Sequence, residues 1–138
     1  MKMRKYDTVI FDLDGTLLDT LEDLADAVND ALRSAGMPER TLEEVRAFVG
    51  NGVRRLIELS VPGGIENLRF EEVFGNFRAY YSVHCNDKTK PYEGIVSLLQ
   101  ELKEEGFALA IVSNKLDAAV KELSEIYFHI IILNIYVC

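Results

Sequence analysis

Two aspartates separated by a single residue are the side chains of this sequence best suited to chemistry. Asp12 and Asp14 directly follow residues 8–11, whose apolar and β-favouring composition predicts a short buried strand. In an open parallel sheet, ligands bind beyond the carboxyl ends of the strands. Two carboxylates at such an end suit Mg²⁺, which prefers hard oxygen ligands. One carboxylate can also attack phosphorus and form an aspartyl-phosphate, and Gly15 allows a sharp turn beside it.

Two other interpretations of this loop compete with a magnesium site. Asp and Gly are common turn residues, so they could simply end the strand. A calcium-binding loop requires glycine at its sixth position and glutamate at its twelfth. Counted from Asp12, Gly15 is the fourth residue and Asp23 is the twelfth, so the calcium interpretation fails.

A second polar pair follows another apolar segment. Ser113 and Asn114 come after residues 107–112, which predict a second buried strand, and precede a helix expected from about 117 to 127. A hydroxyl and backbone N–H groups at a strand-to-helix junction can hold a phosphate. Ser and Asn are also frequent helix caps, so this pair alone does not decide between the two roles.

The order of the expected elements predicts an α/β fold with a parallel sheet. The segment 17–87 is expected to be helical throughout, with a capping-box pair, Thr41 and Glu44, at the start of one helix. A further helix near 95–105 should end at Gly106. We therefore expect two domains, residues 1–16 plus 88–138 and residues 17–87.

Composition limits the classes of partner. The chain has 138 residues, 49% of them hydrophobic, and a formal net charge of −8, which disfavours nucleic acid and anionic membranes as partners. No apolar run has the length of a membrane span and no signal peptide is evident, so a cytoplasmic location is expected. Cys85 and Cys138 lack metal-like spacing and are expected to be ordinary thiols.

Residues 11–20, Phe-Asp-Leu-Asp-Gly-Thr-Leu-Leu-Asp-Thr, resemble the first motif of the haloacid dehalogenase-like phosphatases, and most closely the phosphoglycolate phosphatase subgroup. The resemblance implies that Asp12 is the nucleophile. It implies that Asp14 is first the acid that protonates the leaving oxygen and then the base that activates water. It also implies a Mg²⁺ cofactor bound by the Asp12 carboxylate and the Asp14 main-chain carbonyl.

The same resemblance assigns roles to residues elsewhere. Ser113 would bind phosphate oxygens with Asn114 beside it, and Thr16 and Gly52 would complete the phosphate and substrate contacts. Residues 49–54 resemble a cap loop of the subgroup. The implied fold is a Rossmann-like core, incomplete and holding only the first strands, with an inserted α-helical cap domain. Lys115 is common in this subgroup but is not expected to be the family's catalytic lysine, which comes well downstream.

The implied function is Mg²⁺-dependent hydrolysis of small phosphate monoesters resembling 2-phosphoglycolate, through an aspartyl-phosphate. The expected partner is therefore a small phosphorylated metabolite. A phosphomutase of the same superfamily is an alternative that the sequence barely separates from a phosphatase.

The chain departs from the family near its end. The downstream lysine and the acidic Gly-Asp loop of the family do not occur, and the resemblance is expected to stop near Phe128. Residues 129–138 are almost wholly apolar and β-favouring, which suggests a truncated or frame-shifted product that self-associates through this tail. A catalytically impaired fragment is thus a further alternative, and the strand at 8–11 should lie at a sheet edge.

Overall fold

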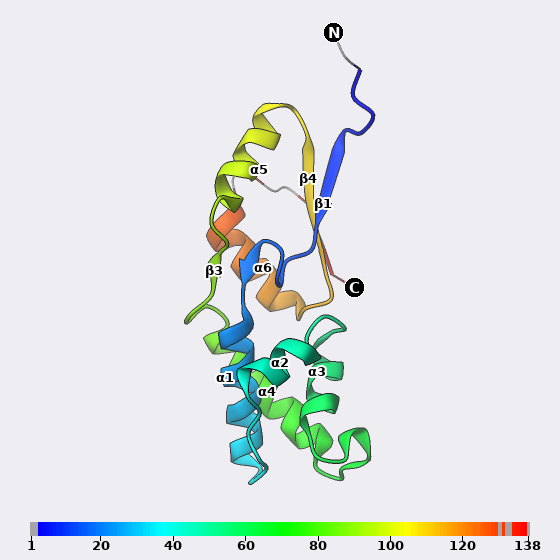
Figure 1. The fold of residues 1–138 in the computed structure, drawn as a ribbon, viewed down its shortest axis with the longest axis vertical. Coiled ribbons are helices and arrows are strands. Elements are labelled where there is room, and N and C mark those ends of the chain that lie inside the picture. The colour runs from blue at the N-terminus through cyan, green and yellow to red at the C-terminus, as the bar shows by residue number, and fades with distance from the viewer. Residues whose placement is uncertain (1–2, 130, 132–133, 138) are drawn as a thin grey trace. The chain divides into compact units, whose positions relative to one another are not determined.

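The structure is a computed structural model that describes residues 3–129, 131 and 134–137 (Figure 1). The chain forms two compact units. Unit 1 comprises residues 1–19 and 91–138, and unit 2 comprises residues 20–90. These boundaries lie three residues beyond the domain boundaries expected from the sequence, which were 16/17 and 87/88.

Unit 1 contains a parallel three-stranded sheet in the order β1-β4-β5, formed by Thr8–Phe11, Ala108–Ser113 and Asn134–Val137. Figure 1 shows β1 in blue running beside β4 in yellow. Thr8 pairs with Ala108 and Phe11 with Ile111, so the carboxyl ends of the two strands lie on the same side of the sheet. The expected α/β class is confirmed. The expectation that residues 8–11 form an edge strand also holds within the described sheet.

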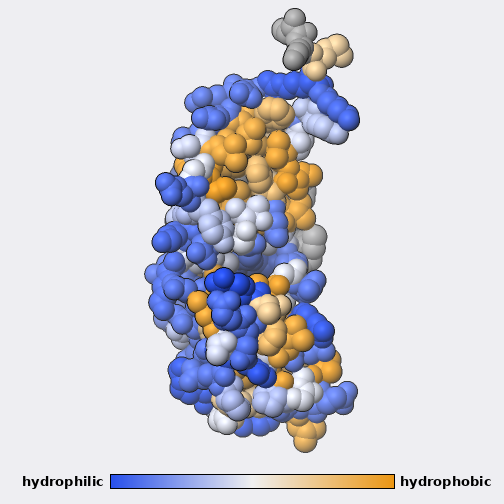
Figure 2. Space-filling view, in the orientation of Figure 1, coloured by the Kyte–Doolittle hydropathy of each residue, from blue (hydrophilic) through white to orange (hydrophobic). Residues whose placement is uncertain are grey.

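The interior of unit 1 is apolar around β4, the central strand of the described sheet. Leu109, Ala110 and Ile111 are buried, as expected for a central parallel strand. Helix α5 (Ile95–Glu104) contacts β4, and helix α6 (Asp117–Phe128) contacts β5. The expectation that residues 8–11 form a buried strand is wrong: β1 lies at an edge of the described sheet, none of its four residues is buried, and Ile10 is 63% exposed. Figure 2 shows apolar side chains gathered in the region of the unit 1 strands.

Two short strands were not predicted. Leu18–Asp19 forms β2 and pairs with β3 (Lys90–Pro91) in a two-stranded sheet. The expectation that the helical segment begins at residue 17 is therefore wrong, because residues 17–19 belong to unit 1 and the first helix starts at Leu21. A strand of two residues is too short to show a period of two, so the sequence carries no signal for it.

Unit 2 is helical. It contains α1 (Leu21–Ser34), α2 (Leu42–Phe48), α3 (Val53–Ser60), the 3₁₀ turn η1 (Gly64–Glu66) and α4 (Phe70–His84). Helices α1 and α4 lie side by side (Figure 1) and bury apolar side chains at intervals of three and four residues. Those of α4 are Phe70, Val73, Phe77 and Tyr81.

Local signals explain where these helices begin and end. The Thr41 side chain accepts a hydrogen bond from the Glu44 backbone N–H at 3.1 Å, as the capping-box spacing predicted. Gly36 ends α1 with a φ of 70°, a conformation that glycine adopts without steric cost. Gly106 follows α5 with a φ of 86°, which confirms the expected helix end.

A buried carboxylate ties the first helix of unit 2 to the end of that unit. Asp23 of α1 is 2% exposed. Its Oδ2 atom accepts hydrogen bonds from the backbone N–H groups of Lys88 (2.9 Å) and Thr89 (2.8 Å) and from the Thr89 hydroxyl (2.7 Å). Three donors compensate the charge that burial would otherwise make unfavourable.

Within the described residues, no helix has the length and apolar character needed to cross a membrane.

Candidate active site

The loop after β1 is a tight turn built around one carbonyl group. Leu13 is fully buried, and its carbonyl oxygen accepts hydrogen bonds from the N–H groups of Thr16, Leu17 and Leu18 at 3.0–3.3 Å. The Gly15 N–H donates back to the Leu18 carbonyl at 2.9 Å, and Gly15 has a φ of 75°. A buried leucine and a left-handed glycine thus fix the backbone on either side of Asp14.

This turn presents its two carboxylates differently. Asp12 is exposed, and its Oδ1 atom accepts a hydrogen bond from the Leu13 N–H at 2.8 Å. The Asp14 side chain is only 24% exposed. An exposed carboxylate oriented by a backbone donor can meet an incoming phosphorus atom. A half-buried carboxylate two residues further on is better placed to exchange a proton than to attack.

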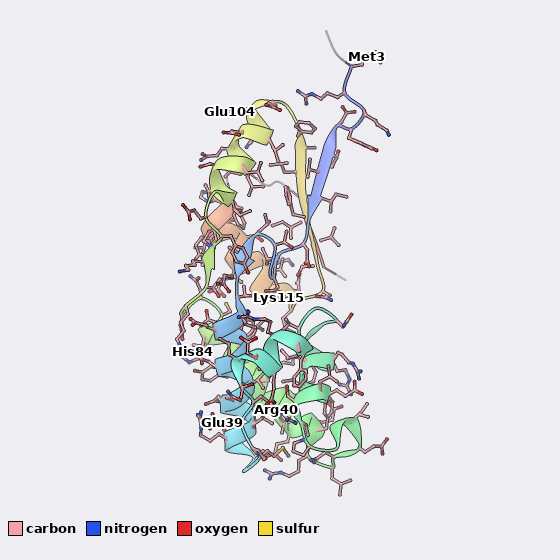
Figure 3. All side chains as sticks on the ribbon, in the orientation of Figure 1. Met3, Glu39, Arg40, His84, Glu104 and Lys115 are labelled. Atoms are coloured by element: carbon pink, nitrogen blue, oxygen red, sulfur yellow. The ribbon has the colours of Figure 1, made fainter. Side chains whose placement is uncertain are left out.

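The loop after β4 supplies a hydroxyl and a cation. Ser113 ends β4 and is 2% exposed, and its Oγ atom accepts a hydrogen bond from the Lys115 N–H at 3.2 Å. Asn114 is exposed. The Lys115 side chain is fully buried, and its Nζ atom lies 2.8 Å from Oδ1 of Asp14. Figure 3 labels Lys115 between β4 and α6.

Sheet register explains how residues a hundred positions apart come into contact. Phe11 is the β1 partner of Ile111 in β4, so the loops that carry Asp14 and Lys115 leave the sheet at the same edge. The structure therefore brings Asp12, Asp14 and Thr16 together in one turn and sets the loop after β4 beside it.

The remaining predicted residues divide between the units. Thr16 is exposed in the β1 turn, Ser113 is the last residue of β4 and Asn114 follows it, all three in unit 1. Gly52 belongs to unit 2, where it precedes α3 with a φ of 86°. Its role in substrate binding remains a prediction. Lys115 is the residue that sequence reasoning set aside, although adjacent parallel strands could have indicated its meeting with Asp14.

The oxygen donors of the β1 turn fit a magnesium ion. Asp12 offers an exposed carboxylate and Asp14 a main-chain carbonyl, and Mg²⁺ is commonly held by one or two carboxylates with several water molecules retained. The described residues contain no group of three or more His, Cys, Asp or Glu side chains arranged to hold a metal.

A parallel sheet with an Asp-x-Asp turn after its first strand defines the class of protein. Residues 9–134 match the family model of the haloacid dehalogenase-like hydrolases, so the chain belongs to that family. The match extends to residue 134, and the expectation that the likeness stops near Phe128 is therefore wrong.

Two curated relatives show which members of this family the chain is similar to. The chain is 37% identical over 129 residues to a phosphoglycolate phosphatase of Aquifex aeolicus, covering 90% of this chain and 59% of the relative. It is 39% identical over 114 residues to a phosphoglycolate phosphatase of Psychrobacter arcticus, covering 78% and 50%. The chain thus spans about half the length of the curated relatives it matches.

A solved structure gives the same picture of the fold. The crystal structure of a predicted phosphoglycolate phosphatase from Haemophilus somnus superposes with a TM-score of 0.90 at 26% identity. The superposition covers 99% of this chain and 64% of that one. The Rossmann-like α/β fold expected from the sequence is confirmed by this likeness.

Proposed function

We propose that this chain carries the nucleophile and the acid–base residue of a Mg²⁺-dependent phosphatase that hydrolyses small phosphate monoesters. The single observation that carries the proposal is the β1 turn, which presents an exposed Asp12 carboxylate beside a half-buried Asp14 that contacts a buried cation. Membership of the haloacid dehalogenase-like hydrolases supports it.

In the first half-reaction an oxygen of the Asp12 carboxylate forms a bond to phosphorus, and the bond from phosphorus to the substrate's leaving oxygen breaks. Asp14 donates its proton to that leaving oxygen, so the alcohol departs neutral. The products of this step are the free alcohol and an aspartyl-phosphate on Asp12.

In the second half-reaction Asp14 takes a proton from water as the water oxygen bonds to phosphorus. The bond between phosphorus and the Asp12 oxygen breaks, which restores the carboxylate and releases inorganic phosphate. Ser113 and Asn114 lie at the end of the neighbouring strand and would hold phosphate oxygens. The Asp12 carboxylate and the Asp14 main-chain carbonyl would hold a Mg²⁺ ion, which would neutralise phosphate charge.

For the substrate we propose a small phosphate monoester of the 2-phosphoglycolate kind. The support is that several relatives at 33–39% identity are named phosphoglycolate phosphatase. A relative at 34% identity from Pseudomonas aeruginosa is named N-acetylmuramic acid 6-phosphate phosphatase, so a sugar phosphate is the first comparison substrate to assay.

The proposal is tested with p-nitrophenyl phosphate and Mg²⁺, using Asp12→Asn as the inactivated variant. Asp7→Asn is the matched control, because Asp7 is an exposed aspartate just before β1, at the opposite end of that strand from Asp12. We expect turnover in the wild type and in Asp7→Asn, and its loss in Asp12→Asn. Turnover by Asp12→Asn at the rate of the wild type would refute the assignment of Asp12 as the nucleophile.

A second candidate is a catalytically impaired chain that self-associates. One observation favours self-association: β1 lies at an edge of the described sheet, and Ile10 is 63% exposed. This candidate predicts a dimer or larger species in light scattering together with no Asp12-dependent turnover, whereas an active monomer would exclude it.

A further inference from the structure

Lys115 differs from every other cation that forms an ion pair among the described residues. Its side chain has no exposed surface, whereas the other lysine, arginine and histidine side chains in such pairs are at least 30% exposed. Its Nζ atom lies 2.8 Å from the Asp14 carboxylate. Burial of an ammonium group is unfavourable without such a partner. The attraction between the two charges offsets this desolvation cost only when the geometry of the ion pair is good.

Both partners are anchored by backbone structure. Lys115 is held two residues after the buried Ser113 by the hydrogen bond from its own N–H to the serine Oγ. Asp14 is held by its bridge to Leu18 and by the turn around the Leu13 carbonyl. An ammonium group fixed on one strand end therefore faces a carboxylate fixed on the neighbouring strand end, which limits the rotation of the Asp14 side chain.

We propose that Lys115 is a positioning residue that holds the Asp14 carboxylate in place for proton transfer. This inference rests on the proposed function, in which Asp14 is the acid and then the base. By engaging Oδ1 of Asp14, Lys115 fixes the direction of that side chain, and Asp12 is left to attack phosphorus. In its acid form Asp14 carries the proton on Oδ2 while Oδ1 accepts from the Lys115 ammonium. A carboxyl group directed in this way delivers that proton to the leaving oxygen without first changing rotamer.

A purely structural ion pair is the competing explanation, and leaving-group dependence separates the two. A 2,4-dinitrophenolate departs readily without a proton, whereas the phenolate of phenyl phosphate needs one. The ratio kcat/KM reports steps up to the release of this first product, because formation of the aspartyl-phosphate commits the substrate. A positioning role therefore predicts a selective loss with phenyl phosphate, and a structural role predicts equal losses.

The experiment measures kcat/KM for both aryl phosphates with Mg²⁺ in the wild type, Lys115→Met and Lys115→Gln. Lys121→Met is the matched control, because Lys121 forms a 2.8 Å ion pair with Asp117 but is 66% exposed. We expect Lys115→Met to lower kcat/KM for phenyl phosphate by about 10²–10³-fold, and for the dinitrophenyl ester by less than about tenfold. Lys121→Met should change neither value.

The quantity compared is the ratio of the two kcat/KM values within one preparation, so a partly unfolded variant gives the same answer as a fully folded one. Losses that are equal for the two esters in Lys115→Met and Lys115→Gln would overturn the positioning role while the proposed function stands. A wild type without Asp12-dependent turnover would instead overturn the proposed function, and with it the role of Lys115.

Discussion

Removal of the Asp23 carboxylate should destabilise the protein far more than removal of a neighbouring exposed aspartate. In Asp23→Ala the buried Thr89 N–H loses its acceptor, which costs about 2 kcal/mol. The Thr89 hydroxyl can rotate and the part-buried Lys88 N–H can reach water, so together these two groups add about 1 kcal/mol. The total of about 3 kcal/mol corresponds to a fall in Tm of about 10 °C for a chain of this size.

The assay is thermal unfolding followed by far-ultraviolet circular dichroism, with two comparison variants. Asp23→Asn retains an oxygen where Oδ2 accepts its three hydrogen bonds but loses the charge, and should cost about 1 kcal/mol. Asp26→Ala is the matched control. Asp26 lies on the same helix, is 45% exposed and pairs with the Lys88 ammonium at 2.7 Å, so its loss should move Tm by no more than about 2 °C. If Asp23→Ala and Asp26→Ala melt together, the hydrogen bonds to Asp23 do not stabilise unit 2 and the reasoning is wrong.

Three further changes probe unit 2. Phe77→Ala removes a fully buried ring stacked on Tyr81, with centroids 5.6 Å apart, and should lower the unfolding free energy in urea by about 3–5 kcal/mol. Gly36→Ala places a side chain at a φ of 70° and should cost about 1 kcal/mol in the same titration. The hydrogen bond from Arg54 lowers the pKa of Glu71 below its ordinary 4.5. The stabilising effect of that pair is therefore present above the ordinary pKa and lost as pH falls through the lowered one, and NMR titration of Glu71 in Arg54→Gln should show the pKa return toward 4.5.

For each of these changes, one experimental result would contradict the expected outcome. A Phe77→Leu chain as unstable as Phe77→Ala would mean that ring volume is not what the site requires. Gly75→Ala is the control for Gly36→Ala, because Gly75 lies within α4 and a Cβ added there would meet open space. This substitution should raise the free energy of unfolding by roughly 0.5–1 kcal/mol. A Glu71 titration that Arg54→Gln leaves unchanged would show that this exposed pair does not form in solution.

Strand and helix cores were predictable where a short-range signal exists. The strand at residues 8–11 was located to the residue, because an apolar β-favouring run ends abruptly at Asp12. The helix start at Thr41 and the helix end at Gly106 follow from side-chain capping and from the freedom of glycine, both of which act within four residues. Such interactions can be recognised in the sequence alone.

Contacts that depend on tertiary pairing were not predictable in the same way. β2 and β3 are two residues each, and they exist because Leu18–Asp19 and Lys90–Pro91 meet across the chain. The ion pair between Asp14 and Lys115 joins residues 101 positions apart. This ion pair forms because β1 and β4 are neighbours in one sheet. The order of elements predicted a parallel sheet, but no local sequence pattern indicates which strands are neighbours.

Asp23 also has a consequence for how the chain folds. Thr8 and Ala108 pair across 100 residues of chain, a long loop to close. Unit 2 lies within that interval, and its helices can form from contacts near in sequence. Once Asp23 binds Lys88 and Thr89, only the flanking segments remain to be ordered, which lowers the entropic cost of pairing the strands by on the order of 1 kcal/mol. We therefore expect unit 2 to form early and Asp23→Ala to slow the pairing of β1 with β4 in refolding experiments.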